Sequence, residues 1–128
     1  MRAAAATSLL IMFTLSIHIF ASSELDQKVE DLQDIFRGST DYKEYQAQTL
    51  ALIKKHPNNI KVNRAYVESS IRLNQGDKVA FEYQQRFTKE KNDLNQYLLL
   101  KAQYRTLGWS AEEQERKKEI VTKLEKLK

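Results

Sequence analysis

Apolar residues recur along this chain at spacings of three and four, which place side chains on one face of an α-helix. Six segments show this spacing, and short stretches carrying Gly, Pro, Asn or Ser separate them. No run alternates with period two for long enough to predict a strand. Residues 24–128 are therefore expected to form an all-α domain of six helices joined by short turns.

Each predicted helix has an apolar stripe that is expected to face inward. The stripes are Leu25, Val29, Leu32 and Phe36; Tyr45, Leu52 and Ile53; Val62, Tyr66 and Leu73; Val79, Tyr83 and Phe87; Tyr97, Leu100, Tyr104 and Leu107; and Ile120, Leu124 and Leu127. Local signals set the helix ends. Gly38, Pro57 and Gly108 are predicted to end helices, and Ser110 with Glu113 forms a capping box that starts the last one.

A longer repeat runs through these stripes. Leu32 and Phe36 have apolar counterparts at Leu100 and Tyr104, which lie two periods of 34 further along the chain. The segment DYKEYQAQTLALIKKHPNN, at 41–59, begins a helix and ends it at a Pro-Asn-Asn turn. A period of this length indicates stacked pairs of helices, in which a lone pair does not bury its apolar face.

These motifs resemble the tetratricopeptide repeat family. DYKEY…IKKHPNN matches the second half of a unit, and LNQGD at 73–77 and TLGWSAEEQ at 106–114 resemble its middle turn. The resemblance covers three units, 26–59, 60–93 and 94–127. The middle unit departs from the pattern, since Asn63 and Ser70 stand at apolar positions and Pro57 has no counterpart at Lys91. Another bundle of helical hairpins is the alternative.

The resemblance implies a short α-solenoid whose first helices line a concave groove, and this groove would hold a peptide or helix of a partner protein. The groove residues, taken at steps of 34, are Glu30, Asp34, Arg37, Arg64, Glu68, Ile71, Leu98, Ala102 and Arg105. Such a groove would be acidic in the first unit, mixed in the second and apolar in the third. The alternative for Leu98 is burial beneath the last helix.

The segment 1–23 has the layout of a secretory signal peptide. Arg2 is its only charge, an apolar run extends over 9–20, and Ala21, Ser22 and Ser23 are small. Cleavage is expected after Ser23 or after Ala21, which would leave a periplasmic or secreted domain. An uncleaved anchor over residues 3–21 is the alternative.

Charge and composition favour a binding protein over an enzyme. Without Arg2 the chain has 20 basic and 17 acidic residues, a net charge of +3, which is too weak for a nucleic-acid protein. Cysteine is absent, which excludes disulfides and thiol chemistry, and His56 is the only histidine of residues 24–128. No glycine-rich phosphate loop occurs. The residues predict no catalytic site, metal, cofactor or small-molecule substrate.

The sequence-based interpretation is an exported, non-enzymatic module or assembly factor that binds a protein. Its aromatic residues, including Phe81 and Trp109, are expected to interlock in the core. The alternative is a membrane-associated protein, held by residues 3–21 or by the basic last helix, where Lys117, Lys118 and Lys123 lie above an apolar stripe.

Overall fold

The computed structural model describes residues 24–127, and the predicted signal peptide and anchor lie outside this range. The described residues are helices and short turns, with no strand among them, which confirms the all-α prediction. The chain divides into two compact units, one ending at Gly38 and one beginning at Ser39. In the first unit, residues 24–37 are helical and bury Val29, Leu32 and Phe36, three of the four positions predicted for this stripe.

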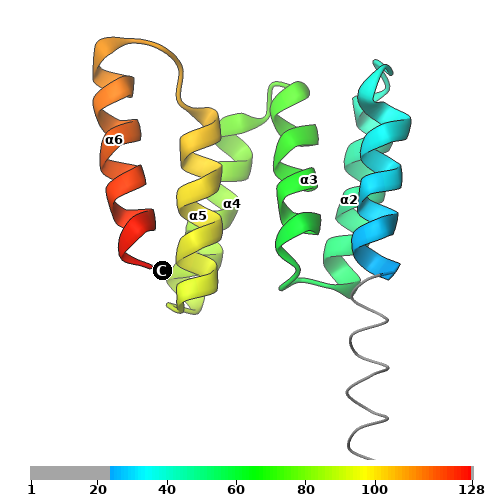
Figure 1. Ribbon diagram of the computed structural model, residues 1–128, viewed down its shortest axis with the longest axis horizontal. Helices are drawn as coiled ribbons and strands as arrows, with labels where there is room; N and C mark the ends of the chain where they lie inside the picture. The colour runs from blue at the N-terminus through cyan, green and yellow to red at the C-terminus, as the bar shows by residue number, and fades with distance from the viewer. Residues whose placement is uncertain (1–23, 128) are drawn as a thin grey trace, which may run out of the picture. The chain divides into compact units, whose positions relative to one another are not determined.

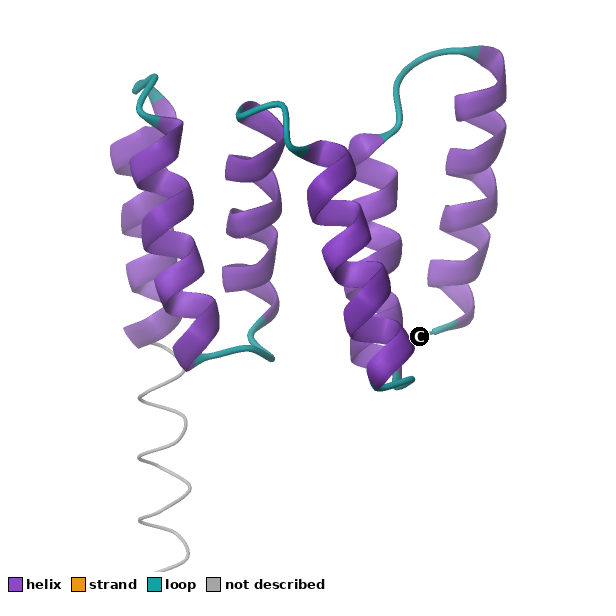
Figure 2. Cartoon of the chain, turned by 180° about the vertical axis from the view of Figure 1, so that it is seen from behind, coloured by secondary structure: helices purple, strands orange, loops and turns teal. Residues whose placement is uncertain are grey.

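The second unit contains five helices, labelled in Figure 1. They are α2 (Tyr42–Lys55), α3 (Ile60–Arg72), α4 (Gly76–Lys89), α5 (Asp93–Thr106) and α6 (Ala111–Lys126). The short turns that join them are visible in Figure 2.

Side-chain caps fix where most of these helices begin. Asp41, Asn59, Asn92 and Ser110 each accept a hydrogen bond from the backbone amide three residues ahead. This bond satisfies one of the amides that a helix leaves free in its first turn. After α3 the chain reverses at Asn74, whose φ of 61° is a left-handed conformation that asparagine tolerates better than most residues.

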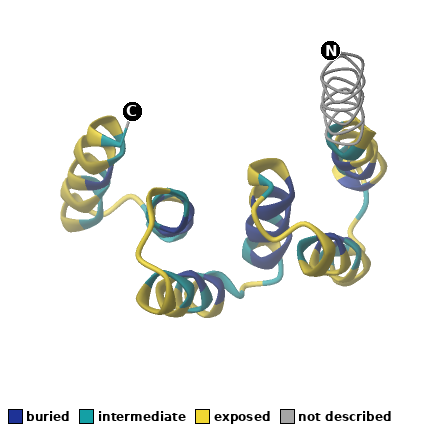
Figure 3. Ribbon diagram, turned by 90° about the horizontal axis from the view of Figure 1, so that it is seen from below, coloured by how far each residue is buried: buried dark blue, intermediate teal, exposed yellow. Residues whose placement is uncertain are grey.

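Helices α2 to α6 pack in an alternating order. α2 packs mainly on α3 and α4 mainly on α5, while α3 also contacts α4 and α5, and α5 contacts α6. The backbones of α2 and α4 do not approach each other closely, although Gln46 of α2 donates a hydrogen bond to Gln75, the N-cap of α4, at 2.7 Å. Seen from below in Figure 3, α3 and α5 therefore lie on one side of this unit and α2 and α4 on the other.

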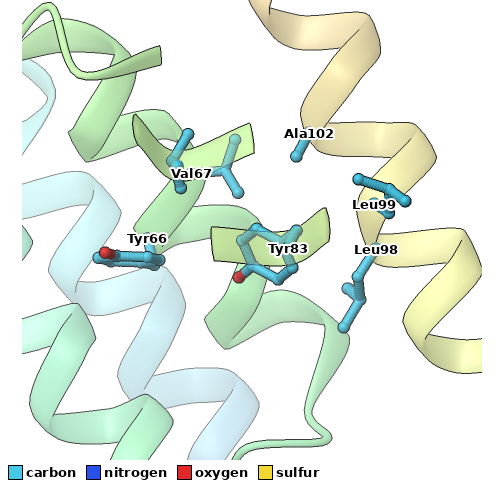
Figure 4. Packing of buried hydrophobic residues seen from close by; sticks show 7 residues of the cluster. Tyr66, Val67, Tyr83, Leu98, Leu99 and Ala102 are labelled. Carbon is cyan, nitrogen blue, oxygen red and sulfur yellow. The ribbon is translucent and has the colours of Figure 1, made fainter. Parts of the chain in front are cut away.

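The apolar core of this unit lies between α3, α4 and α5 (Figure 4). Its buried members are Tyr66, Val67, Val79, Tyr83, Leu98, Leu99 and Ala102. Half-buried side chains, among them Ile71, Phe87 and Tyr97, pack against its edge. Each helix contributes residues spaced by one, three or four, because these spacings bring side chains to one side of a helix.

The burial patterns of α3 and α5 repeat each other with a period of 33. Their N-caps, Asn59 and Asn92, have this spacing. Each buried position of α5 lies 33 residues after a buried position of α3: Asn95, Leu98, Leu99, Leu100 and Ala102 correspond to Val62, Ala65, Tyr66, Val67 and Ser69. The other two buried residues of α3, Asn63 and Ser70, correspond to the half-buried Gln96 and Gln103. α2 and α4 instead repeat with a period of 34, with Tyr45 and Thr49 corresponding to Val79 and Tyr83.

One loop explains why these two periods differ. Four residues, 56–59, connect α2 to α3, but only three, 90–92, connect α4 to α5. The caps His56 and Asn59 of the first loop correspond to Glu90 and Asn92 of the second, so Lys91 alone stands opposite Pro57 and Asn58. Every residue of α5 is therefore one position earlier than a strict period of 34 predicts.

A buried hydrogen-bond network centres on Asn63, one of the two polar residues that stand at apolar positions of the predicted middle repeat, 60–93. Asn63 is fully buried, and its amide donates to the carbonyl oxygens of Pro57 at 3.0 Å and Asn59 at 2.7 Å. Its Oδ1 accepts from the Tyr83 hydroxyl at 2.6 Å and from Arg86 Nη1 at 3.3 Å. Asn63 therefore links the α2–α3 turn to α4.

Arg86 extends this network to the next turn. Its Nε donates to Asn95 Oδ1 at 2.7 Å, and its Nη2 donates to Asn58 Oδ1 at 3.0 Å. Ser70 is the other polar residue at an apolar position of the predicted middle repeat, and its hydroxyl donates to the Tyr66 carbonyl at 2.8 Å. Both departures from the repeat pattern are thus buried and satisfied, as buried polar groups must be to avoid a desolvation penalty.

Candidate partner-binding surface

The nine predicted groove residues occupy three kinds of position. Glu30, Asp34 and Arg37 are exposed on the first helix, where Asp34 and Arg37 form an ion pair at 3.0 Å. On helices α3 and α5, Arg64 and Arg105 are exposed and Glu68 and Ile71 are half-buried. Leu98 and Ala102 are buried, with 4% and 0% of their surface exposed.

The assignment of Leu98 and Ala102 to an open groove disagrees with this burial and has to be corrected. Both side chains belong to the core cluster and face Tyr83 and Val67 (Figure 4), so a partner has no access to them. Leu98 is buried, as the alternative predicted, but the core cluster that contains it is built from α3, α4 and α5 and includes no residue of the last helix. The error comes from the step of 34, which leads from Arg64 to Leu98, whereas the step of 33 leads to Tyr97.

The same one-residue shift changes which tyrosines face inward. Tyr97 and Tyr104 were predicted to be core, but Tyr97 is half-buried and 37% of Tyr104 is exposed. Leu100, which shared their predicted stripe, is buried. The accessible positions of α5 therefore include Tyr97, Lys101, Tyr104 and Arg105.

Tyr97, Lys101 and Tyr104 lie 33 residues after Arg64, Glu68 and Ile71, and since α3 and α5 contact each other, we treat the two sets as one surface. We call this surface the α3–α5 face. It consists of Arg64, Glu68, Ile71, Tyr97, Lys101, Tyr104 and Arg105. It differs from the predicted groove on α5, where tyrosine and basic side chains replace the expected leucine and alanine.

The α3–α5 face is basic. Glu68 is its only acidic member, and Arg72 lies 3.6 Å from that carboxylate. Lys101 and Arg105 form no ion pair with any residue of the described range. Their charges are therefore open to a partner, and Tyr97 and Ile71, which are half-buried against the core, add the part of their apolar surface that stays uncovered.

A second surface lies where α5 turns into α6, and sequence reasoning missed it. Trp109 was predicted to be core, yet 86% of it is exposed, and Phe81 on α4 is likewise 61% exposed. A usable signal was present. A hydrophobic residue just before an N-cap often packs on a hydrophobic fourth residue of the helix. Trp109 precedes the N-cap Ser110, but the fourth residue is the polar Gln114, so the sequence offers Trp109 no such contact.

Trp109 has a cationic neighbour. The Lys117 ammonium lies 4.2 Å from the centre of the Trp109 ring and 5.5 Å from that of Tyr104. We call Tyr104, Trp109 and Lys117 the α5–α6 corner. Tyr104 is shared between this corner and the α3–α5 face, so the two surfaces are continuous.

The pKa shifts of titratable groups within residues 24–127 come from burial and from hydrogen bonds within the fold. No group of three His, Asp or Glu side chains in this range is placed to hold a metal ion. Burial, with a hydrogen bond to Glu82, raises the pKa of Tyr66 to about 12. Hydrogen bonds from the Gly108 amide and the Ser110 hydroxyl lower the pKa of Glu113. Both shifts have structural causes.

A shallow depression on α4 is lined by Glu82, Gln85, Arg86, Lys89 and Glu90. Its two central charges already have partners, because Glu82 accepts from Tyr66 at 2.7 Å and Arg86 donates to three asparagines. It is therefore a weaker candidate than the α3–α5 face.

Comparison with known proteins adds no relative: no family model, no curated protein and no solved structure matches this chain. Within residues 24–127, no helix has both the length and the apolar composition needed to cross a membrane.

Proposed function

We propose that this chain is an exported, non-enzymatic adaptor or assembly factor that holds a peptide or helix of a partner protein on its α3–α5 face. The proposed architecture is a degenerate solenoid of three tetratricopeptide-like units, in which α3 and α5 are the first helices of the second and third units. Export rests on the sequence of residues 1–23, which the structure does not describe.

One observation carries this proposal. α3 and α5 bury equivalent positions with a period of 33, contact each other, and leave the same side of each helix uncovered. Equivalent contacts at a regular interval are what stacked repeats require, and the uncovered sides of neighbouring first helices then form one continuous surface. A helix bundle with an unrelated topology has no reason to repeat its burial pattern.

The composition of this surface favours a protein as the partner. Tyrosine and arginine are enriched where proteins bind one another, since both combine apolar contact area with hydrogen-bonding groups. The α3–α5 face carries Tyr97, Tyr104, Arg64 and Arg105. An extended or helical peptide that lies along α5 would reach all three accessible positions spaced by three and four, 97, 101 and 104.

Site-specific photo-cross-linking in the native host tests the proposal. A photoreactive amino acid replaces Lys101 on α5, and in the control variant it replaces Gln84, which is exposed on α4. We expect a discrete protein adduct from position 101 and none from position 84. Equal adducts from both positions, or none from position 101, would contradict the proposal.

Export has its own test. Mass spectrometry of the chain isolated from its host is expected to find a first residue of Glu24 or Ser22. An intact residue 1 would instead favour the membrane-anchored alternative.

A further inference from the structure

The loop between α5 and α6 holds Trp109 in a fixed position. Ser110, which follows it, accepts a hydrogen bond from the Glu113 amide at 3.2 Å and donates one to the Glu113 carboxylate at 2.8 Å. Gly108, which precedes it, donates its amide to the same carboxylate. Both neighbours of Trp109 are thus tied to Glu113, so a partner that packs on this ring has little loop entropy to remove.

Lys117 differs from the basic residues on either side of it. Arg116 pairs with Glu112 at 2.9 Å, and Lys118 pairs with Glu115 at 2.9 Å. Lys117 forms no ion pair within the described residues and instead lies over Trp109 and Tyr104. Contact with two aromatic rings stabilises the ammonium but leaves its charge in place.

The corner therefore combines a large apolar ring with a positive charge that forms no ion pair within the described residues, although the Glu113 carboxylate attracts it from a greater distance. The adjoining α3–α5 face adds Lys101 and Arg105, which are also without ion pairs in the described range. Opposite charge and an apolar anchor are the complement of such a surface.

We infer that the α5–α6 corner binds an acidic segment of a partner protein, with one aromatic or aliphatic side chain of that segment packed on Trp109 and its carboxylates beside Lys117, Lys101 and Arg105. This inference rests on the proposed function and specifies its partner class.

An anionic membrane is a poorer occupant of this corner. The outer side of α6 carries the paired charges of Arg116 with Glu112 and Lys118 with Glu115, so its acidic groups would face the lipid headgroups. A membrane-binding helix instead places several apolar side chains on one exposed face. In α6, Ile120 is buried and Val121 is the large hydrophobic residue that is exposed.

The chain has a single tryptophan, so the emission of Trp109 reports on the corner alone. A random peptide library displayed on phage is selected against the chain as its host produces it. We expect the enriched peptides to combine Asp or Glu with one aromatic or aliphatic residue, and to shift Trp109 emission to shorter wavelength. Anisotropy of the labelled peptides gives their dissociation constants.

Matched variants locate the binding. Trp109→Ala should weaken binding roughly tenfold or more, as expected for a central aromatic anchor. Lys117→Gln should weaken it severalfold and reduce its dependence on salt. Phe81→Ala, at another exposed aromatic, and Lys118→Gln, at a paired lysine, should bind like the wild type, and circular dichroism should show all four variants folded.

Several outcomes would overturn the inference. These are enrichment of basic or uncharged peptides, binding that is indifferent to Trp109→Ala, or an emission shift caused by phosphatidylglycerol vesicles and not by the peptides. A shift that appears on concentrating the chain alone would indicate a second copy as the occupant, which also overturns it. If position 101 still cross-links a protein in the host while Trp109→Ala has no effect, the inference fails and the proposed function stands.

Discussion

Replacing Asn63 by alanine tests whether its buried hydrogen-bond network stabilises the packing of helices α2 to α6. The side chain makes four hydrogen bonds, two donated to the α2–α3 turn and two accepted from α4. Alanine removes all four and leaves the Tyr83 hydroxyl and the Pro57 carbonyl oxygen without this partner, while the Asn59 carbonyl keeps its bond from the backbone amide of residue 63. Because Asn63 is fully buried, water does not replace these bonds unless the structure opens.

The expected loss follows from the individual bonds. A typical hydrogen bond contributes about 0.5–1.5 kcal/mol, and the contact with Arg86 is long, so Asn63→Ala should lower the free energy of unfolding by about 3–4 kcal/mol. For a domain of this size that loss corresponds to a fall in Tm of roughly 15–25 °C. Asn58→Ala removes a single bond to the same Arg86, at an exposed position, and should cost less than about 1 kcal/mol.

Urea unfolding followed by circular dichroism measures both variants. A double-mutant cycle with Tyr83→Phe should show a coupling of roughly 0.5–3 kcal/mol, since both substitutions remove the same bond. If Asn63→Ala and Asn58→Ala lose equal stability, or if the cycle shows no coupling, the network does not contribute as described.

Three further predictions concern the core and the titratable groups. Leu98→Ala should cost about 2–5 kcal/mol in urea unfolding, as for a buried leucine, while the adjacent Tyr97→Ala should cost less; the reverse order would show that the register is wrong. Glu113 has a lowered pKa, so it stabilises the folded state above its usual pKa and loses that contribution as the pH falls through its folded pKa. The difference in free energy of unfolding between the wild type and Glu113→Gln should therefore disappear in acid, and a constant difference would contradict this. Tyr66 has a pKa raised to about 12, so its contribution is complete below the unfolded value of about 10 and is lost between about pH 10 and about pH 12. The advantage of the wild type over Tyr66→Phe in urea unfolding should shrink across that window, and an advantage that grows would refute it.

The helices and most of their inward faces could be predicted from spacing and caps alone. Tyr45, Leu52, Val79 and Ile120 are buried at predicted positions. Periodicity succeeds here because the apolar stripe of an amphipathic helix is fixed by residues three and four apart within that helix. It does not depend on what covers the stripe.

The face of α5 could not be predicted in this way. Its segment YLLLKAQY is apolar on too many sides for the stripe to be unique, so the register had to come from the repeat period. One residue fewer in the loop 90–92 than in 56–59 moves every side chain of α5 by about 100° around the helix. Leu98 and Ala102 were consequently placed on the surface, and Tyr97 and Tyr104 in the core.

The polar core was also beyond sequence reasoning. Asn63 and Ser70 stand at positions where the other two predicted repeats are apolar, so the sequence alone suggests a departure from the repeat pattern. Their hydrogen-bond partners are either residues distant in the chain or backbone atoms, and a sequence pattern does not reveal them. Tyr83 and Arg86 lie on the next helix, 20 and 23 positions after Asn63, so no local signal pairs them with it. A buried asparagine is interpretable only when both its donors and its acceptor have identified partners.

The most direct test of the α3–α5 face is the dissociation constant of the partner cross-linked from position 101, measured by calorimetry for two matched charge reversals. Lys101→Glu alters the face, and Lys89→Glu makes the same change on exposed α4. We predict that Lys101→Glu weakens binding roughly tenfold or more, with both variants folded, and that Lys89→Glu stays within about twofold of the wild type. Equal weakening by the two reversals, or a larger effect at Lys89, would contradict a partner-binding surface on α3 and α5.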